Sequence, residues 1–167
     1  MNYATIKDYD IANGPGVRVS LFVSGCVHHC KDCFNPEAWD FDYGKPFTET
    51  VMERILTMMR SEYIRGITYL GGEPFDPHNQ PGLLELTRKI RAAYPDKSIW
   101  SFTGYVYGQN LPQLPGVTEE LLAGLDVLVD GPFIASLKNL GLRFRGSENQ
   151  RLIDMPKTLR TGAVVLW

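Results

Sequence analysis

All the cysteines of this chain lie in one short stretch, Cys26 to Cys33, which reads CVHHCKDC. Their spacing is C-x3-C-x2-C, and the 167 residues contain no fourth cysteine. Clustered thiols of this kind are typical of a metal or cluster site, because the thiolate is the form of cysteine that binds metals. Three thiols without a fourth indicate that one metal position is left for a different ligand.

Two kinds of metal site and one redox pair compete for this stretch. A structural zinc ion could take the three cysteines together with His28 or His29. Zinc ligands usually come as two separated pairs, however, and a histidine inside the three-residue gap would be strained, so a [4Fe-4S] cluster with one open iron is favoured. Cys30 and Cys33 also form a C-x-x-C redox pair, but that interpretation leaves Cys26 unexplained. We therefore expect the three thiols to bind iron and both histidines to be exposed loop residues.

Strand and helix patterns alternate along the rest of the chain. The expected strands are 17–23, 66–70, 98–102 and 126–129, and the expected helices are 50–60, 81–93 and a short one from 118. Thr50 and Glu53 have the spacing of a capping box, and Thr118 is the expected N-cap of the short helix. Residues 1–16 are polar and predict irregular structure, and Gly162–Trp167 predicts one more short strand.

Each expected strand runs into unusual residues at its carboxyl end. The first leads to the cysteines, and the others lead to Gly71-Gly72-Glu73-Pro74, Thr103-Gly104-Tyr105 and Asp130-Gly131-Pro132-Phe133. Carboxyl ends of parallel strands meet at one edge, where α/β proteins place their active sites. A full eight-fold barrel needs at least roughly 200 residues. We therefore expect an α/β fold that is an abbreviated, open partial (β/α) barrel, in a single domain spanning 1–167.

The composition is that of an ordinary globular protein, with 44% hydrophobic and 22% charged residues. A net charge of -2 argues against a general affinity for nucleic acid. No apolar run is long enough for a signal peptide or a membrane span. Because clustered free thiols persist best in a reducing compartment, we expect a cytoplasmic protein without membrane or nucleic-acid partners.

A resemblance emerges from the motifs taken together. C-x3-C-x2-C after the first strand, followed by Gly71-Gly72-Glu73-Pro74 after the next, resembles the radical S-adenosylmethionine superfamily. The segments NGPGVR from Asn13, FVSGCVH from Phe22 and CFN from Cys33 are similar to the glycyl-radical-enzyme activases within it. The short chain and RGSENQ from Arg145 are similar to the branch that serves anaerobic (class III) ribonucleoside-triphosphate reductases. The resemblance covers about residues 11–154.

The resemblance implies a radical S-adenosylmethionine oxidoreductase with two cofactors, a [4Fe-4S] cluster and S-adenosylmethionine. In that superfamily the amino and carboxylate groups of S-adenosylmethionine chelate the open iron. One electron from the reduced cluster breaks a C–S bond of the sulfonium, and the resulting 5′-deoxyadenosyl radical abstracts a hydrogen atom. For an activase, that atom comes from a backbone glycine of a partner enzyme.

The implied partner is the large subunit of the anaerobic ribonucleoside-triphosphate reductase. The implied assembly is a homodimer of this chain or a heterotetramer with the reductase. With no second cluster encoded, the electron is expected from a flavodoxin-like or ferredoxin-like protein. Two alternatives stay open. One is an activase of another glycyl radical enzyme, such as pyruvate formate-lyase, and the other is a zinc-stabilised interaction module.

The resemblance also assigns residues to S-adenosylmethionine. Gly71 and Gly72 would let the backbone approach its methionine end, with strand-end carbonyls and Glu73 near its ammonium group. Many members of the superfamily have an aromatic residue before the third cysteine, whereas this chain has Asp32 there and Phe34 after it. Adenine contacts are therefore expected from the backbone of Asp32 to Phe34 and from the Phe34 ring.

Each of the other charged and polar candidates has two alternative roles. Thr103 and Asp130, at later strand ends, are candidates for ribose or carboxylate contacts, or else for loop capping. Arg18 either offsets the cluster's negative charge or pairs with an acidic neighbour. The basic residues Arg143, Arg145 and Arg151 form a solvated face or a docking segment for the partner.

Overall fold

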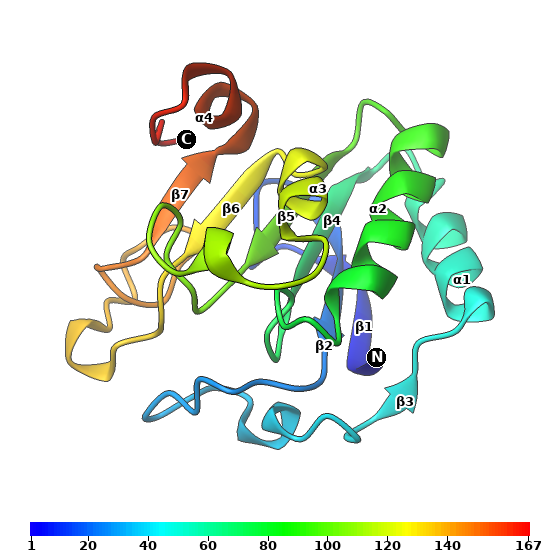
Figure 1. Ribbon diagram of the computed structural model, residues 1–167. Helices are drawn as coiled ribbons and strands as arrows, with labels where there is room; N and C mark the ends of the chain where they lie inside the picture. The colour runs from blue at the N-terminus through cyan, green and yellow to red at the C-terminus, as the bar shows by residue number, and fades with distance from the viewer.

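A computed structural model describes residues 1–167, and its centre is a seven-stranded sheet with the order β3-β1-β2-β4-β5-β6-β7 (Figure 1). The strands are β1 (Asn2–Asp10), β2 (Val17–Val23), β3 (Lys45–Pro46), β4 (Ile64–Gly71), β5 (Ser98–Phe102), β6 (Val127–Asp130) and β7 (Arg151–Asp154). The four central strands, β2, β4, β5 and β6, are parallel to one another. β1, β3 and β7 join them antiparallel at the two edges.

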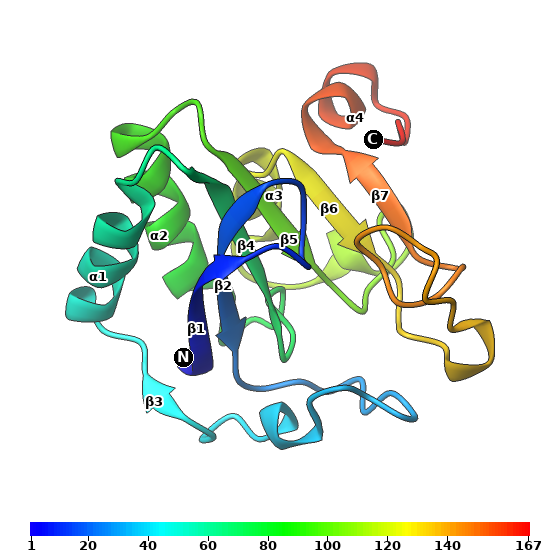
Figure 2. The same ribbon diagram turned by 180° about the vertical axis from the view of Figure 1, so that it is seen from behind.

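Three helices cover one face of this sheet. They are α1 (Glu49–Met59), α2 (Gln80–Ala93) and α3 (Thr118–Ala123), and α4 (Met155–Thr161) follows β7 near the C-terminus. The chain also forms short 3-10 helices at Pro36–Trp39, Leu111–Gln113 and Ala135–Leu137. From behind, in Figure 2, β1 and β2 lie toward the viewer and α1 to α3 lie beyond the sheet. The two faces of the sheet are therefore covered in different ways.

The alternation of side chains along the strands explains this asymmetry. Val19, Leu21 and Val23 of β2 belong to the main apolar core of 22 buried residues, together with buried residues of α1, α2 and α3. The opposite face carries only a small cluster, in which Trp100 and Val129 are buried. The sheet thus has a dry face under the helices and a second face that is free to line a cavity.

The predicted α/β class and the alternation of strands and helices are confirmed. The four expected strands and three expected helices are present, with bounds that shift by at most two residues. The parallel order of β2, β4, β5 and β6 brings all four carboxyl ends to one edge of the sheet, as the motifs required.

The prediction for the N-terminus was wrong, because residues 2–10 form a strand rather than irregular structure. This strand lies near an edge of the sheet, and most of its side chains are partly or fully exposed, so its sequence lacks the apolar alternation that marks a half-buried strand. Two shifts of register against β2 interrupt the pattern further.

The helix caps were misplaced by one or two residues. α1 begins at Glu49 with Thr48 as N-cap, rather than at the Thr50 capping box. α3 begins at Thr118, so Val117 occupies the N-cap position.

The C-terminal prediction was also wrong. The last residues make only an isolated bridge between Ile153 and Leu166, whereas the strand of this region is β7 and a helix, α4, follows it. No helix has the length and apolar character that crossing a membrane would require.

Candidate functional site

The cysteines lie on a loop that leaves the carboxyl end of β2 and runs along the lower edge of the sheet (Figures 1 and 2). His29 and Asp32, which directly precede Cys30 and Cys33, adopt left-handed conformations with φ of 46° and 59°. The start of the loop is held by the 3-10 helix that follows it, since the N–H of Gly25 donates to the carbonyl of Ala38 at 2.8 Å. The loop is therefore tightly turned and anchored.

A cavity of about 500 Å³ opens beside this loop. All three cysteines line it, together with residues from the loops after β4, β5 and β6 and from the segment 138–150. Phe22, Leu70 and Phe102 form its floor on the face of the sheet opposite the helices. Two residues of its lining, Phe34 and Leu140, are 67% and 90% exposed, so the cavity is open to solvent on that side.

The three thiols are free and partly buried. Burial raises the pKa of Cys26 from 9.0 to about 11, and the nearby Glu73 charge acts in the same direction, while backbone N–H groups of His28 and His29 oppose it. Burial likewise raises the pKa of Cys30. Because ligation requires thiolates, any metal group that binds here must displace these protons.

The zinc alternative has no closed site in this geometry. His28 is held by Glu73, and the ring of His29 stacks on Trp39 with centroids 4.7 Å apart. No three side chains among His, Cys, Asp and Glu lie close enough to hold one metal ion. An iron–sulfur cluster spreads its thiolates over separate irons, so three cysteines around an open cavity fit it better.

Gly71 and Gly72 bring the loop after β4 against the cysteine loop. The N–H of Gly72 donates to the carbonyl of Val23 at 2.7 Å, and the N–H of Glu73 donates to that of Gly25 at 2.8 Å. A Cβ on Gly72 would lie 2.5 Å from the carbonyl oxygen of Gly25. The glycines thus permit close contact of two backbones. They also line the cavity, where approach to a cofactor stays a prediction.

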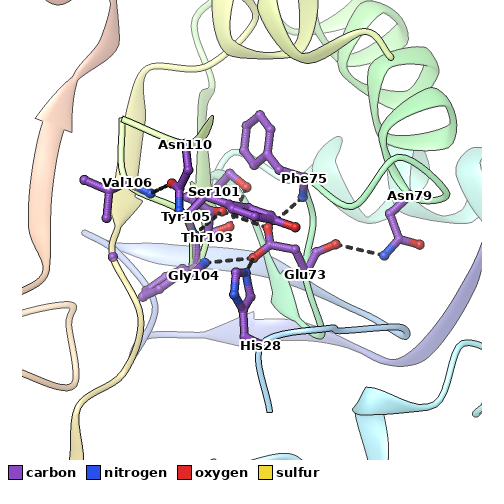
Figure 3. A network of polar contacts seen from close by, with 12 residues as sticks. His28, Glu73, Phe75, Asn79, Ser101, Thr103, Gly104, Tyr105, Val106 and Asn110 are labelled. Atoms are coloured by element: carbon purple, nitrogen blue, oxygen red, sulfur yellow. Dashed lines mark hydrogen bonds and ion pairs between the residues drawn. The ribbon is translucent and has the colours of Figure 1, made fainter. Parts of the chain in front are cut away.

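Glu73 joins three loops (Figure 3). Its Oε1 accepts hydrogen bonds from the N–H of Phe75 and from Thr103 Oγ1, both at 2.8 Å. Its Oε2 accepts from the N–H of Gly104 at 2.8 Å and contacts His28 Nε2 at 2.7 Å. A carboxylate offers about four acceptor positions, so all of them are filled. Glu73 is 1% exposed and in this structure serves the loops, whereas sequence reasoning placed it near an ammonium group.

The other candidate residues for S-adenosylmethionine divide into two groups. Phe34 and Thr103 line the cavity, and Phe34 also packs on Phe133 with ring centroids 5.1 Å apart. Asp32 is exposed and Asp130 is buried, and neither lines the cavity.

Asp130 is instead tied to the neighbouring strand and loop. Its Oδ1 accepts from Arg151 Nε at 3.0 Å, and its Oδ2 accepts from the N–H of Tyr107 at 2.8 Å. These hydrogen bonds match the second role considered for Asp130, in which it caps a neighbouring loop.

Arg18 lies near the amino end of β2, at the far end of the strand from the cysteine loop, and is fully buried. It donates to Thr68 Oγ1 and Ser98 Oγ at 2.8 Å and to the carbonyl of Ile67 at 2.7 Å. Burial lowers its pKa to about 10, so it is charged at neutral pH. No carboxylate pairs with it, and neither role proposed from the sequence fits: it joins β2, β4 and β5.

Sequence reasoning missed two features of the site. His28 was expected in solvent, yet its side chain is only 17% exposed. The segment 138–146 lines the cavity through Lys138, Phe144 and Arg145. The basic residues gave a signal for the segment, but no local pattern links His28 to Glu73, because they are 45 residues apart and meet only when their strands pair.

Comparison with known proteins gives a consistent result. Residues 12–153 match the model of the family described as "4Fe-4S single cluster domain". The chain is 42% identical over 152 residues to an anaerobic ribonucleoside-triphosphate reductase-activating protein of Escherichia coli (strain K12), covering 90% of this chain and 96% of that protein. Proteins of the same name from Vibrio cholerae and Enterobacteria phage T4 are 41% and 39% identical, covering 90% and 91% of this chain and 96% and 93% of theirs.

Proposed function

The chain belongs to the anaerobic ribonucleoside-triphosphate reductase-activating proteins, which carry a 4Fe-4S domain, and from this premise we propose that it generates a glycyl radical on that reductase. It would do so as a radical S-adenosylmethionine oxidoreductase, by reductive cleavage of S-adenosylmethionine at a [4Fe-4S] cluster.

One observation carries this proposal. Three thiols from a single loop line an open cavity of about 500 Å³, together with the glycine-rich loop of the adjacent strand. Cys26, Cys30 and Cys33 would hold the cluster through three of its irons, and no further cysteine is present to close the fourth position.

Bound S-adenosylmethionine would supply the radical chemistry on one-electron reduction. Of the candidate residues, Gly71, Gly72, Phe34 and Thr103 line the cavity and support binding there. Glu73 would act by holding the surrounding loops. The backbone next to Asp32 stays a candidate for adenine, whereas the paired Asp130 supports the loop after β6.

The shape of the molecule supports a protein substrate. One face of the sheet has no helix over it, which is compatible with an abbreviated, open barrel in a single domain (Figure 2). The cavity opens at exposed Phe34 and Leu140, so a glycine on a partner's chain could reach the cysteine loop. A flavodoxin-like or ferredoxin-like reductant would supply the electron, and free thiols support a reducing cytoplasm.

The test is anaerobic reconstitution with iron and sulfide, followed by incubation with reductant, S-adenosylmethionine and the reductase. We expect a brown protein and a glycyl radical signal in the electron paramagnetic resonance spectrum, and neither in the Cys30→Ala variant. A colourless protein that holds one zinc ion would refute the cluster. A radical formed on pyruvate formate-lyase but not on the reductase would refute the assigned partner.

A further inference from the structure

His28 is held in place on several sides. Its Nε2 lies 2.7 Å from Glu73 Oε2, and its ring meets the Tyr105 ring edge-on with centroids 4.4 Å apart. The absence of a side chain at Gly104 makes room for it, because a Cβ there would lie 2.5 Å from His28 Cδ2. The hydrogen bond to Glu73, the packing on Tyr105 and the space beside Gly104 together hold the His28 ring in one orientation.

The acceptor for His28 is rigid before the histidine reaches it. Three donors from the loops after β4 and β5, the N–H of Phe75, Thr103 Oγ1 and the N–H of Gly104, fix the Glu73 carboxylate. The remaining acceptor position is filled by the cysteine loop, through His28. The hydrogen bond therefore attaches the cysteine loop to a carboxylate whose other three hydrogen bonds come from the loops after β4 and β5.

The attachment point lies between two thiols. His28 follows Cys26 by two residues and precedes Cys30 by two. The backbone N–H groups of His28 and His29 face the Cys26 thiol and oppose the rise in its pKa that burial causes. Hydrogen bonds to ligand sulfurs are among the features that set the reduction potential of an iron–sulfur cluster. An anchor on His28 thus controls both the loop and the donors that face Cys26.

We infer that His28 is a positioning residue for the proposed cluster: by anchoring the cysteine loop to Glu73 it holds the thiols in ligating geometry and keeps backbone N–H groups directed at Cys26. The inference rests on the proposed function, since it assumes that the three thiols bind a cluster. It assigns His28 no contact with iron.

The adjacent histidine provides a matched control. His29 is exposed, stacks on Trp39 and has no hydrogen bond to Glu73. A general effect of losing a histidine from this loop would appear in both variants, whereas loss of the anchor would appear only at position 28.

The experiment compares the wild type with His28→Ala, His28→Gln and His29→Ala, each full-length and reconstituted anaerobically, without reductase or S-adenosylmethionine. The first readout is the rate at which a chelator removes iron, and the second is the midpoint potential of the cluster. Loss of residues that orient metal ligands typically costs roughly 10- to 100-fold in metal affinity, so we expect iron to leave His28→Ala on the order of tenfold faster or more.

We expect the potential of His28→Ala to fall, because N–H donors near sulfur stabilise the more negative, reduced cluster. A glutamine amide can donate from a position similar to Nε2, so His28→Gln should recover most of both properties. His29→Ala should match the wild type. If His28→Ala folds poorly, Gly104→Ala supplies the test, because it displaces the ring while leaving the histidine in the chain, and it should show the same two changes.

Equal iron loss and equal potential in His28→Ala and the wild type would overturn the inference, as would equal changes in His29→Ala or no recovery in His28→Gln. These results leave the activase proposal intact. A wild type that assembles no cluster would instead overturn the proposed function, and the inference with it.

Discussion

Two buried charges tie the same three strands together at opposite ends, and they do so in different ways. Arg18, near the amino ends of β2, β4 and β5, donates mainly to strand backbone and to hydroxyl groups on strands. Glu73, beyond the carboxyl ends, accepts only from loops, one of which bears the cysteines. Both are almost completely buried, at 0% and 1% exposure. A charge that fixes strands is expected to serve stability, whereas a charge that fixes loops is expected to serve the site.

The largest expected effect is at the Arg18 end. Arg18→Met keeps an apolar side chain of similar length but leaves the carbonyls of Ile67 and Ser98 without their guanidinium donor. Each buried group left unsatisfied costs about 1–3 kcal/mol, so the free energy of unfolding should fall by roughly 3–5 kcal/mol. Urea unfolding of the cluster-free protein measures this. If the Arg18→Met variant folds but fails to assemble a cluster, Arg18 serves the site as well as stability, and the distinction between Arg18 and Glu73 is wrong.

The glycines beside the two charges sharpen the comparison. A Cβ on Gly66 would lie 1.9 Å from the Ser98 carbonyl oxygen, which belongs to rigid strand backbone. Gly66→Ala should therefore destabilise the protein by about 3 kcal/mol, at the upper end for overpacking. Gly104→Ala meets only the His28 ring and should cost about 1 kcal/mol. Thermal unfolding of both variants checks the order, and a greater loss in Gly104→Ala would contradict it.

Glu73→Gln tests the loop end directly. The amide nitrogen must face donors that now bind a carboxylate oxygen, so at least one buried hydrogen bond is lost. We expect a loss of roughly 1–3 kcal/mol in unfolding free energy, smaller than for Arg18→Met. Iron should be released faster by a chelator, as in His28→Ala. A variant with normal iron retention but greater destabilisation than Arg18→Met would reverse the roles assigned to the two charges.

The smallest expected effect is the dependence on alkaline pH. Because burial raises the pKa of Cys26 from 9.0 to about 11, the folded chain binds this proton more tightly than the unfolded chain. Its contribution to stability is complete below pH 9 and is lost as the pH rises to 11. We expect about 1 kcal/mol, below the full value for such a shift, because the thiol is partly exposed. Urea unfolding of cluster-free wild type and Cys26→Ala at the two pH values isolates this loss, which should be absent in the variant.

The sequence could predict the site's position because its strongest signals are local. The cysteine spacing and the strand before it lie within one short segment, and glycine pairs after strands mark close backbone contacts. The parallel order then brings those segments together without further information. This is why the cysteines and Gly71 to Glu73 meet at one edge of the sheet.

What the sequence could not predict depends on distant partners. β1 pairs at the edge of the sheet with most of its side chains in solvent, so its residues carry no strand pattern. Arg18 is close to the cysteines in the sequence, so it was considered a partner for the cluster. In the structure the extended strand β2 separates Arg18 from the cysteine loop. His28 looked like a solvated loop residue because its partner is supplied by another strand's loop.

The edges of the sheet have a consequence for assembly with other proteins. At one side β3 covers only the start of β1, and the rest of β1 carries Lys7 and Asp8 and two shifts of register. At the other side the C-terminal segment bridges β7 through Leu166. Charged residues, irregular register and covering segments prevent a foreign strand from extending a sheet. A partner of this protein is therefore expected to dock through side chains and loops, and the same features protect the free protein from edge-to-edge aggregation.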